Sequence, residues 1–240
     1  MLLENESIPF VIANLGLAAL AGALTAAFFW PWRSRAARSE NELVEALGAP
    51  LVAARPLAAQ ELARQLSEHW FSKRASLAIV SADSREGRTR VAAELARAFA
   101  ARGEPTLVID ADFRAPALHR AFGLRNRAGL ADFLEGDQPQ IAHCADNLSV
   151  LVAGRSGADP LELLSRARMR ELLAAAARRY RVILVDTPAA ARGPDLQLFA
   201  AFAGGALVVV KRPKRIALER LRDLLVHCKA RVVGTVLSPA

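Results

Sequence analysis

The sequence predicts an α/β fold with a doubly wound, mostly parallel sheet, preceded by one transmembrane helix. From residue 77 onward, short apolar runs alternate with helical patterns, which is typical of a parallel sheet covered on both faces. The first 32 residues instead contain one long apolar run without charge. A chain of 240 residues has room for one such domain and a short appendage.

The N-terminal apolar run predicts a transmembrane helix at residues 8–32. No charged residue occurs between Ser7 and Trp32, and a helix of this length crosses a hydrocarbon layer of about 30 Å. Acidic residues precede the run and three arginines follow it closely, so residues 1–7 are expected outside and the remainder in the cytoplasm. A cleaved signal peptide is the alternative, but its basic residues would precede a shorter apolar core.

The polar stretch after the span predicts a cytoplasmic linker at residues 33–57, because it is helix-capable but interrupted by glycine and proline. We expect the main domain at 58–240. It begins with a helix that carries Leu62, Leu66 and Trp70 on one face at intervals of four residues.

Six apolar runs are candidate strands of the sheet. They lie at 77–81, 106–110, 148–153, 181–186, 206–210 and 231–237. Helices are expected at 89–102, 160–179, 195–203 and 217–229. Ligands of doubly wound sheets bind beyond the carboxyl ends of the strands, so polar turns at those ends are candidate sites.

The turn after the first of these strands resembles a phosphate-binding loop. Ala82 begins it, Gly87 is the glycine that such a loop needs, and Thr89 supplies a hydroxyl for Mg²⁺. Arg88 stands at the position of the phosphate-bridging lysine, and Arg85 stands where such loops often have glycine. A helix N-terminus follows directly, which favours an anion site.

Two further strands end in aspartates. Asp110 and Asp112 alternate at one strand end, with Arg114 just beyond, so both carboxylates can face one site. Such a pair suits Mg²⁺ coordination and general-base activation of a hydroxyl, and it equally suits capping of backbone N–H groups in the next turn. Asp186 follows four apolar residues, as a Walker B aspartate does. The spacing leaves both interpretations of the first pair open.

Composition argues against other classes of site. The net charge of +8 comes mainly from scattered arginines, without a basic stripe interleaved with aromatics, so no nucleic-acid partner is expected. The two cysteines and four histidines do not have the spacing of metal ligands. No metal site made of protein ligands alone is therefore expected.

Three motifs in this order resemble the bacterial tyrosine kinases, or BY-kinases. These are A-x-x-x-x-G-R-T at 82–89, VIDADFR at 108–114 and ILVDTP at 183–188. BY-kinases form the cytoplasmic part of polysaccharide co-polymerases and belong to the ParA/MinD-like group of P-loop NTPases. The second motif is the most specific, because hydrophobic-D-x-D-x-R distinguishes these kinases from other P-loop proteins. The resemblance covers roughly residues 39–238.

The resemblance implies a P-loop NTPase domain that binds ATP and Mg²⁺. It implies the metal at Thr89, Asp110 and Asp186, the catalytic groups Asp110, Asp112 and Arg88, and nucleotide contacts from Ala82, Arg85, Gly87, Arg88, Thr89 and Arg114. It also implies homo-oligomeric rings through an E-x-x-R-x-x-R helix, of which Glu61 and Arg64 are present. The resemblance further implies that the protein lies in the bacterial inner membrane. Its expected partner is a polysaccharide co-polymerase or another exopolysaccharide-assembly membrane protein.

The chain departs from the family pattern at the lysine position, Arg88, and at Ser84 and Arg85, where proline and glycine are usual. A C-terminal tyrosine cluster is missing, and Tyr180 is the one tyrosine. We therefore expect a membrane-anchored, BY-kinase-like ATP-binding protein that regulates exopolysaccharide or capsule biosynthesis and export, with weak or no catalysis. An active tyrosine kinase or ATPase of the same pathway is the alternative. A ParA/MinD-type positioning ATPase is a weaker one, because such proteins reach membranes reversibly.

Overall fold

The computed structural model describes residues 43–48, 51–54, 59–155, 159–164 and 168–238. They belong to one compact unit, Leu43–Ala240. No helix among these residues combines the length and apolarity needed to cross a membrane. The predicted transmembrane helix at 8–32 lies outside the described residues.

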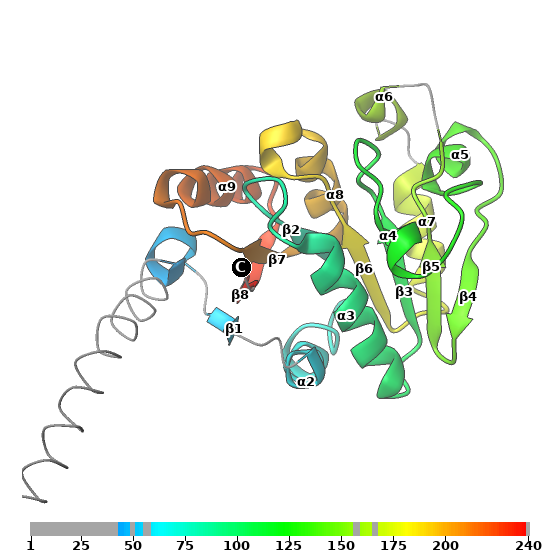
Figure 1. The fold of residues 1–240 in the computed structure, drawn as a ribbon, viewed down its shortest axis with the longest axis horizontal. Coiled ribbons are helices and arrows are strands. Elements are labelled where there is room, and N and C mark those ends of the chain that lie inside the picture. The colour runs from blue at the N-terminus through cyan, green and yellow to red at the C-terminus, as the bar shows by residue number, and fades with distance from the viewer. Residues whose placement is uncertain (1–42, 49–50, 55–58, 156–158, 165–167, 239–240) are drawn as a thin grey trace, which may run out of the picture. The chain divides into compact units, whose positions relative to one another are not determined.

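An eight-stranded sheet forms the centre of the described part of the chain, in the order β1-β8-β7-β2-β6-β3-β5-β4 (Figure 1). The strands are β1 (Leu51–Ala54), β2 (Ser76–Val80), β3 (Thr106–Asp110), β4 (Ala142–Ala145), β5 (Leu148–Leu151), β6 (Val182–Asp186), β7 (Gly205–Val210) and β8 (Arg231–Leu237). Every neighbouring pair is parallel except β4 with β5. The predicted doubly wound, mostly parallel sheet is confirmed.

Helices cover both faces of this sheet (Figure 1). They are α2 (Ala59–His69), α3 (Arg88–Ala101), α4 (Leu118–Ala121), α5 (Leu130–Glu135), α6 (Pro160–Leu164), α7 (Arg168–Ala176), α8 (Asp195–Ala203) and α9 (Arg215–His227), with a 3-10 turn η1 (Ala190–Arg192). Alternate strand residues enter different cores, as the period of a strand requires. Leu184 packs with α2 and α3, whereas Ile183 and Val185 pack with α5 to α8.

The structure extends the sheet beyond the predicted strands. β1 comes from the range assigned to the linker and pairs with β8, and a helical turn at 43–47 packs its apolar side chains in the core with α8 and α9. Within the helix predicted at 160–179 the structure describes α6 and α7, and residues 165–167 between them lie outside the described residues. The apolar face predicted for α2 is confirmed, since Leu62, Leu66 and Trp70 are all buried.

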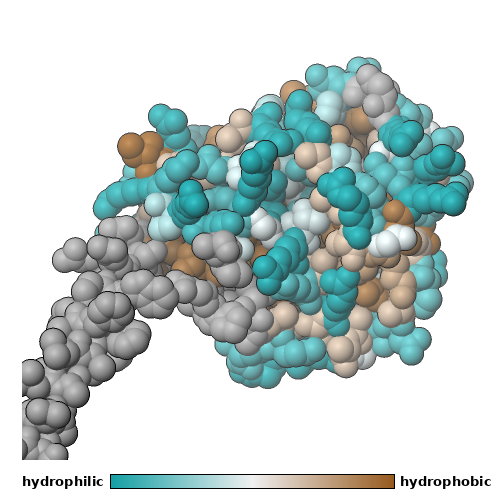
Figure 2. Space-filling view, in the orientation of Figure 1, coloured by the Kyte–Doolittle hydropathy of each residue, from teal (hydrophilic) through white to brown (hydrophobic). Residues whose placement is uncertain are grey.

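The described surface is largely hydrophilic on the face shown in Figure 2, where the hydrophobic residues lie in small groups. Large apolar side chains that are well exposed include Ile216 and Val226 of α9. The strand arrangement brings the carboxyl ends of β2, β3, β6 and β7 to the same edge, so the turns that follow them form the candidate site.

Candidate nucleotide site

The loop between β2 and α3 has the backbone of a phosphate-binding loop. Gly87 precedes α3 with φ 94°, and a Cβ there would lie 2.8 Å from the hydroxyl oxygen of Ser238. Arg85 also has a positive φ, of 63°, in the left-handed region that favours glycine. The loop therefore keeps a glycine-type conformation at a position where this sequence has arginine.

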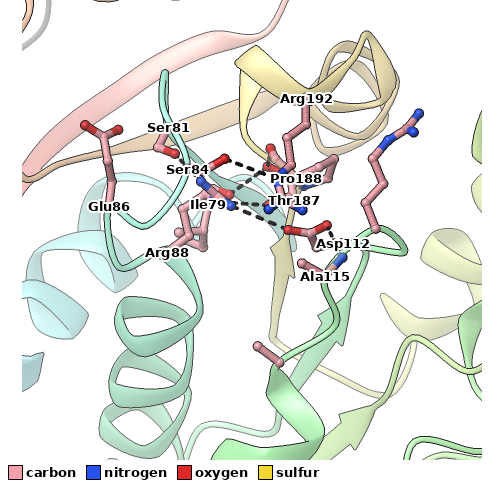
Figure 3. Close-up of polar contacts among 12 residues, drawn as sticks. Ile79, Ser81, Ser84, Glu86, Arg88, Asp112, Ala115, Thr187, Pro188 and Arg192 are labelled. Carbon is pink, nitrogen blue, oxygen red and sulfur yellow. Dashed lines mark hydrogen bonds and ion pairs between the residues drawn. The ribbon is translucent and has the colours of Figure 1, made fainter.

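Arg88 turns back from the first turn of α3 and crosses beneath the loop (Figure 3). Its side chain is 8% exposed. Its Nε donates to the Thr187 carbonyl at 2.8 Å, and one terminal nitrogen donates to the Ser81 hydroxyl and, at 3.1 Å, to the Asp83 carbonyl. The other terminal nitrogen lies 3.5 Å from Oδ2 of Asp112. All three guanidinium nitrogens thus contact the protein itself.

Asp110 and Asp186 lie opposite each other in the register of β3 and β6, and they are 0% and 1% exposed. The Asp110 carboxylate accepts backbone N–H groups of Asp112 at 3.2 Å, Ala117 at 3.0 Å and Leu118 at 2.9 Å. Of the two interpretations of this aspartate, capping of the following turn therefore has direct geometric support. A role for Asp110 in metal binding stays a prediction.

Asp186 is buried without a hydrogen-bond donor at either carboxylate oxygen. Burial, and next the neighbouring Asp110 carboxylate, raise the pKa of Asp186, while the nearby Thr89 side chain and Arg88 lower it. Burial likewise raises the pKa of Asp110, against the effect of its backbone hydrogen bonds. Two adjacent negative charges in a buried environment are unfavourable. The pair is therefore stabilised when it binds either a proton or a cation.

Mg²⁺ fits these residues. It prefers oxygen ligands, and Asp186 offers two oxygens without partners beside the hydroxyl of Thr89. Within the described parts of the chain, no group of three or more His, Cys, Asp or Glu side chains could hold a metal ion alone. Water molecules and phosphate oxygens of a bound nucleotide would complete the coordination.

The remaining predicted acid and arginine are engaged elsewhere. Asp112 accepts the Ala115 N–H at 3.0 Å through Oδ1 and pairs with Arg88 through Oδ2. Arg114 pairs with Asp195 at the start of α8, at 2.9 Å, and this carboxylate raises the pKa of the arginine. Arg114 is thus held by α8 and has no hydrogen bond to the phosphate loop.

A pocket of about 620 Å³ adjoins the outer side of the loop. Residues 83–86 line one side, and Lys211, Arg212 and Lys214, after β7, line another. The Nζ of Lys214 pairs with Asp83 at 2.7 Å, which ties the two segments together. Sequence reasoning missed this cationic segment, although it holds two of the four lysines and follows a predicted strand.

The segment after β6 is joined to the phosphate loop. The Ala191 N–H donates to the Ala82 carbonyl at 3.0 Å, and Nε of Arg192 donates to the Ser84 hydroxyl at 3.1 Å (Figure 3). Nothing in the sequence motifs pointed to Arg192. The loop, the aspartate-bearing strand end and the β7–α9 segment therefore form one continuous site.

The predicted oligomerisation residues lie apart from this site, on the exposed face of α2. Arg64 pairs with Glu61 at 2.6 Å and with Glu68 at 2.8 Å, all within the helix. The hydrogen bond to Arg64 is the main cause that lowers the pKa of Glu61. Ring formation through this helix stays a prediction.

Comparison with known proteins agrees with this geometry, although no protein-family model matches the chain. The chain is 34% identical to tyrosine-protein kinase YwqD of Bacillus subtilis over 169 residues, which cover 68% of this chain and 71% of YwqD. It is 30% identical to tyrosine-protein kinase Etk of Escherichia coli over 174 residues, which cover 68% of this chain and 24% of Etk. The chain thus spans about a quarter of the length of Etk.

Solved structures show the same relation. The chimerical protein CapA2B2 superposes with a TM-score of 0.76 at 25% identity, over 84% of this chain and 100% of that chain. The kinase domain of Escherichia coli Etk gives 0.71 at 27% identity, over 76% of this chain and 74% of that chain. The cell division ATPase MinD of Pyrococcus furiosus shares the fold, with a TM-score of 0.57 at 24% identity over 68% of this chain and 71% of that chain. By sequence, fold and loop architecture, the chain belongs to the family of bacterial tyrosine-protein kinases.

Proposed function

We propose that this chain is a membrane-anchored, nucleotide-binding member of the family that regulates exopolysaccharide or capsule biosynthesis with little phosphoryl transfer of its own. In this proposal residues 8–32 anchor it in the bacterial inner membrane as a single span and the P-loop domain lies in the cytoplasm. A polysaccharide co-polymerase or a related assembly protein is the proposed partner, and copies of the chain associate with one another.

The observation that carries the proposal is the position of Arg88. A lysine at this point of a P-loop bridges phosphates, whereas the Arg88 guanidinium is buried among Ser81, Asp83, Thr187 and Asp112. Arg88 can contact a bound phosphate only if it breaks these contacts and forms new ones to the phosphate. Losing one electrostatic partner of the transition state commonly costs about 3 kcal/mol, or about 100-fold in rate.

Nucleotide binding itself has support from the rest of the site. The helix N-terminus at α3, the loop backbone and the oxygens of Asp186 and Thr89 suit a Mg²⁺–nucleotide complex. Bound Mg²⁺ would neutralise charge on the phosphates. Asp112, which a kinase would use near the reacting hydroxyl, is held by Arg88 and the Ala115 N–H. The groups that would bind the nucleotide are thus available, whereas two groups that would assist phosphoryl transfer, Arg88 and Asp112, are held in other contacts. We therefore expect nucleotide binding without efficient turnover.

An active tyrosine kinase or ATPase is the second candidate. It is favoured by Asp110 and Asp186, which lie side by side at the strand ends, and by the Asp186 carboxylate oxygens, which have no hydrogen-bond partner and would hold Mg²⁺. The two candidates differ in what Arg88 does once nucleotide is bound, and a single substitution separates them.

The test compares the full-length chain in neutral detergent with Arg88→Lys and Asp186→Asn. Mg²⁺–ATP binding is measured by calorimetry, and phosphate release and tyrosine phosphorylation are measured at saturating ATP. We expect the wild type to bind ATP, Arg88→Lys to raise turnover about 100-fold, and Asp186→Asn to lose Mg²⁺-dependent binding. Measurable wild-type turnover that equals or exceeds that of Arg88→Lys would refute the regulatory proposal and establish the enzyme.

A further inference from the structure

A second pocket lies at the end of the sheet opposite the phosphate loop. It has a volume of about 670 Å³ and includes Ser76 and Arg231, the first residues of β2 and β8. The phosphate loop leaves β2 at its other end, after Val80, and five extended residues span roughly 16 Å. In Figure 1, α2 marks the lower end of the strands and the loop before α3 the upper end. The pocket is therefore separate from the nucleotide site.

The pocket is lined by four cationic side chains, Lys73, Arg74, Arg170 and Arg231. No acidic residue of the described chain lines it, and within the described ranges none of the four forms an ion pair. Many other arginines of this protein do have acidic partners, in α2, α3 and α9 among others. An unneutralised group of four cations around one concavity concentrates positive potential there.

Two of these guanidinium groups are held against aromatic rings. The Arg74 guanidinium lies 5.7 Å from the ring centre of Trp70, and the Arg170 guanidinium lies 5.6 Å from that of Phe202. These cation–π contacts favour the observed positions of the two guanidinium groups, so less side-chain entropy is lost when their N–H groups bind a ligand.

The Trp70 ring is itself fixed by the fold. Its Nε1 donates to the Ser76 carbonyl at 2.9 Å, and its six-membered ring lies close to Gly205. A Cβ at Gly205 would come within 2.3 Å of the indole, so the first residue of β7 has to be glycine for the ring to lie there. Trp70 is thus fixed by specific packing, and the four cationic side chains around it are exposed to a ligand in solvent.

We propose that this pocket binds a small, multiply charged phosphate group, a diphosphate or a phosphomonoester. Planar guanidinium groups match phosphate oxygens in pairs, and three of them with one lysine suit a ligand of two or more negative charges. The site goes beyond the nucleotide function proposed above, because it uses none of the same residues and no metal.

The test is calorimetric titration of the full-length chain in neutral detergent with inorganic diphosphate, with EDTA present to exclude metal-dependent binding. The double variant Arg170→Gln, Arg231→Gln removes two of the pocket charges. The control Arg178→Gln, Arg179→Gln removes the same charge from exposed positions that do not line the pocket. The conservative variant Arg231→Lys keeps the charge and loses the planar fork.

We expect the pocket variant to weaken diphosphate binding at least tenfold, Arg231→Lys to weaken it less, and the control to bind as the wild type does. Thermal unfolding of each variant shows whether it is folded. Dihexanoylphosphatidic acid, tested against its phosphatidylcholine analogue, distinguishes a lipid headgroup from a free phosphate as the source of the ligand group. Equal loss in pocket variant and control, unchanged binding in the pocket variant, or no binding by the wild type would each overturn the proposal.

Discussion

Replacing Asp186 by asparagine should stabilise the protein increasingly as the pH rises. In the wild type, burial and the facing Asp110 carboxylate raise the pKa of Asp186 above that of an unfolded aspartic acid, about 3.9. Between those two pKa values the folded state holds a proton that the unfolded chain has released. Raising the pH through this window therefore destabilises the folded state.

The size of the effect follows from the one proton that folded Asp186 retains and the unfolded chain releases. Each pH unit inside the window changes the free energy of unfolding by about 1.4 kcal/mol, so the change from pH 5 to pH 7 is about 3 kcal/mol. The asparagine side chain of the variant is neutral at both pH values and close in shape to the protonated acid. The stability difference between variant and wild type should thus grow by about that amount over the two units.

Urea denaturation of the full-length chain in neutral detergent, followed by circular dichroism at pH 5, 6 and 7, measures this difference. Asp195→Asn is the matched control, because Asp195 is equally buried but paired with Arg114. This variant should be less stable than the wild type at both pH 5 and pH 7. A difference between Asp186→Asn and wild type that stays constant with pH would show that folded Asp186 retains no extra proton in this range, and the reasoning would fail.

Three further substitutions test the loop and the core. Arg85→Gly should raise the free energy of unfolding by about 0.5 kcal/mol. Removing the strain of an arginine in the left-handed region gains about 1–2 kcal/mol, which exceeds the cost of the greater conformational freedom of glycine in the unfolded chain. Urea midpoints measure the change, and a loss of stability would contradict it. Gly87→Ala should weaken nucleotide binding at least tenfold in calorimetry, since its Cβ would meet Ser238 at a positive φ; unchanged affinity would count against the loop geometry. Trp70→Ala should cost about 3–5 kcal/mol by leaving a cavity over Gly205, and a loss below about 1 kcal/mol in the same denaturation assay would show that the site collapses freely.

The long apolar strands could be predicted from sequence because each carries its own signal. The runs at 106–110 and 231–237 and the helix at 195–203 have the predicted bounds, since each is mainly apolar and has a glycine, proline or polar residue directly beside at least one end. β1 and β4 have four residues each and lie at the two edges of the sheet, where only one neighbour is needed. Such short edge strands depend on pairing with a distant partner rather than on their own composition.

The location of the candidate site in the fold could be predicted from the sequence, but the contacts among its side chains could not. The strand-end rule correctly brought the loop, Asp110 and Asp186 to one edge of the sheet. The direction of the Arg88 side chain could not be read locally, because its bonds go to Ser81 and Thr187, which two different strands bring together. The different roles of neighbouring aspartates likewise arise from which backbone N–H groups the fold places beside them.

The strand order has a consequence for how the site is assembled during folding. β2, which carries the phosphate loop, has as neighbours β6 and β7, whose residues come about a hundred positions later. Contacts of such long sequence separation close slowly, because large loops have to be ordered before any pairing energy is gained. A ribosome-bound chain that ends before residue 182 can form the loop and α3, but its central strand has neither neighbour. The loop, Arg88 and the two buried carboxylates can therefore meet only late in synthesis, after β6 has left the ribosome.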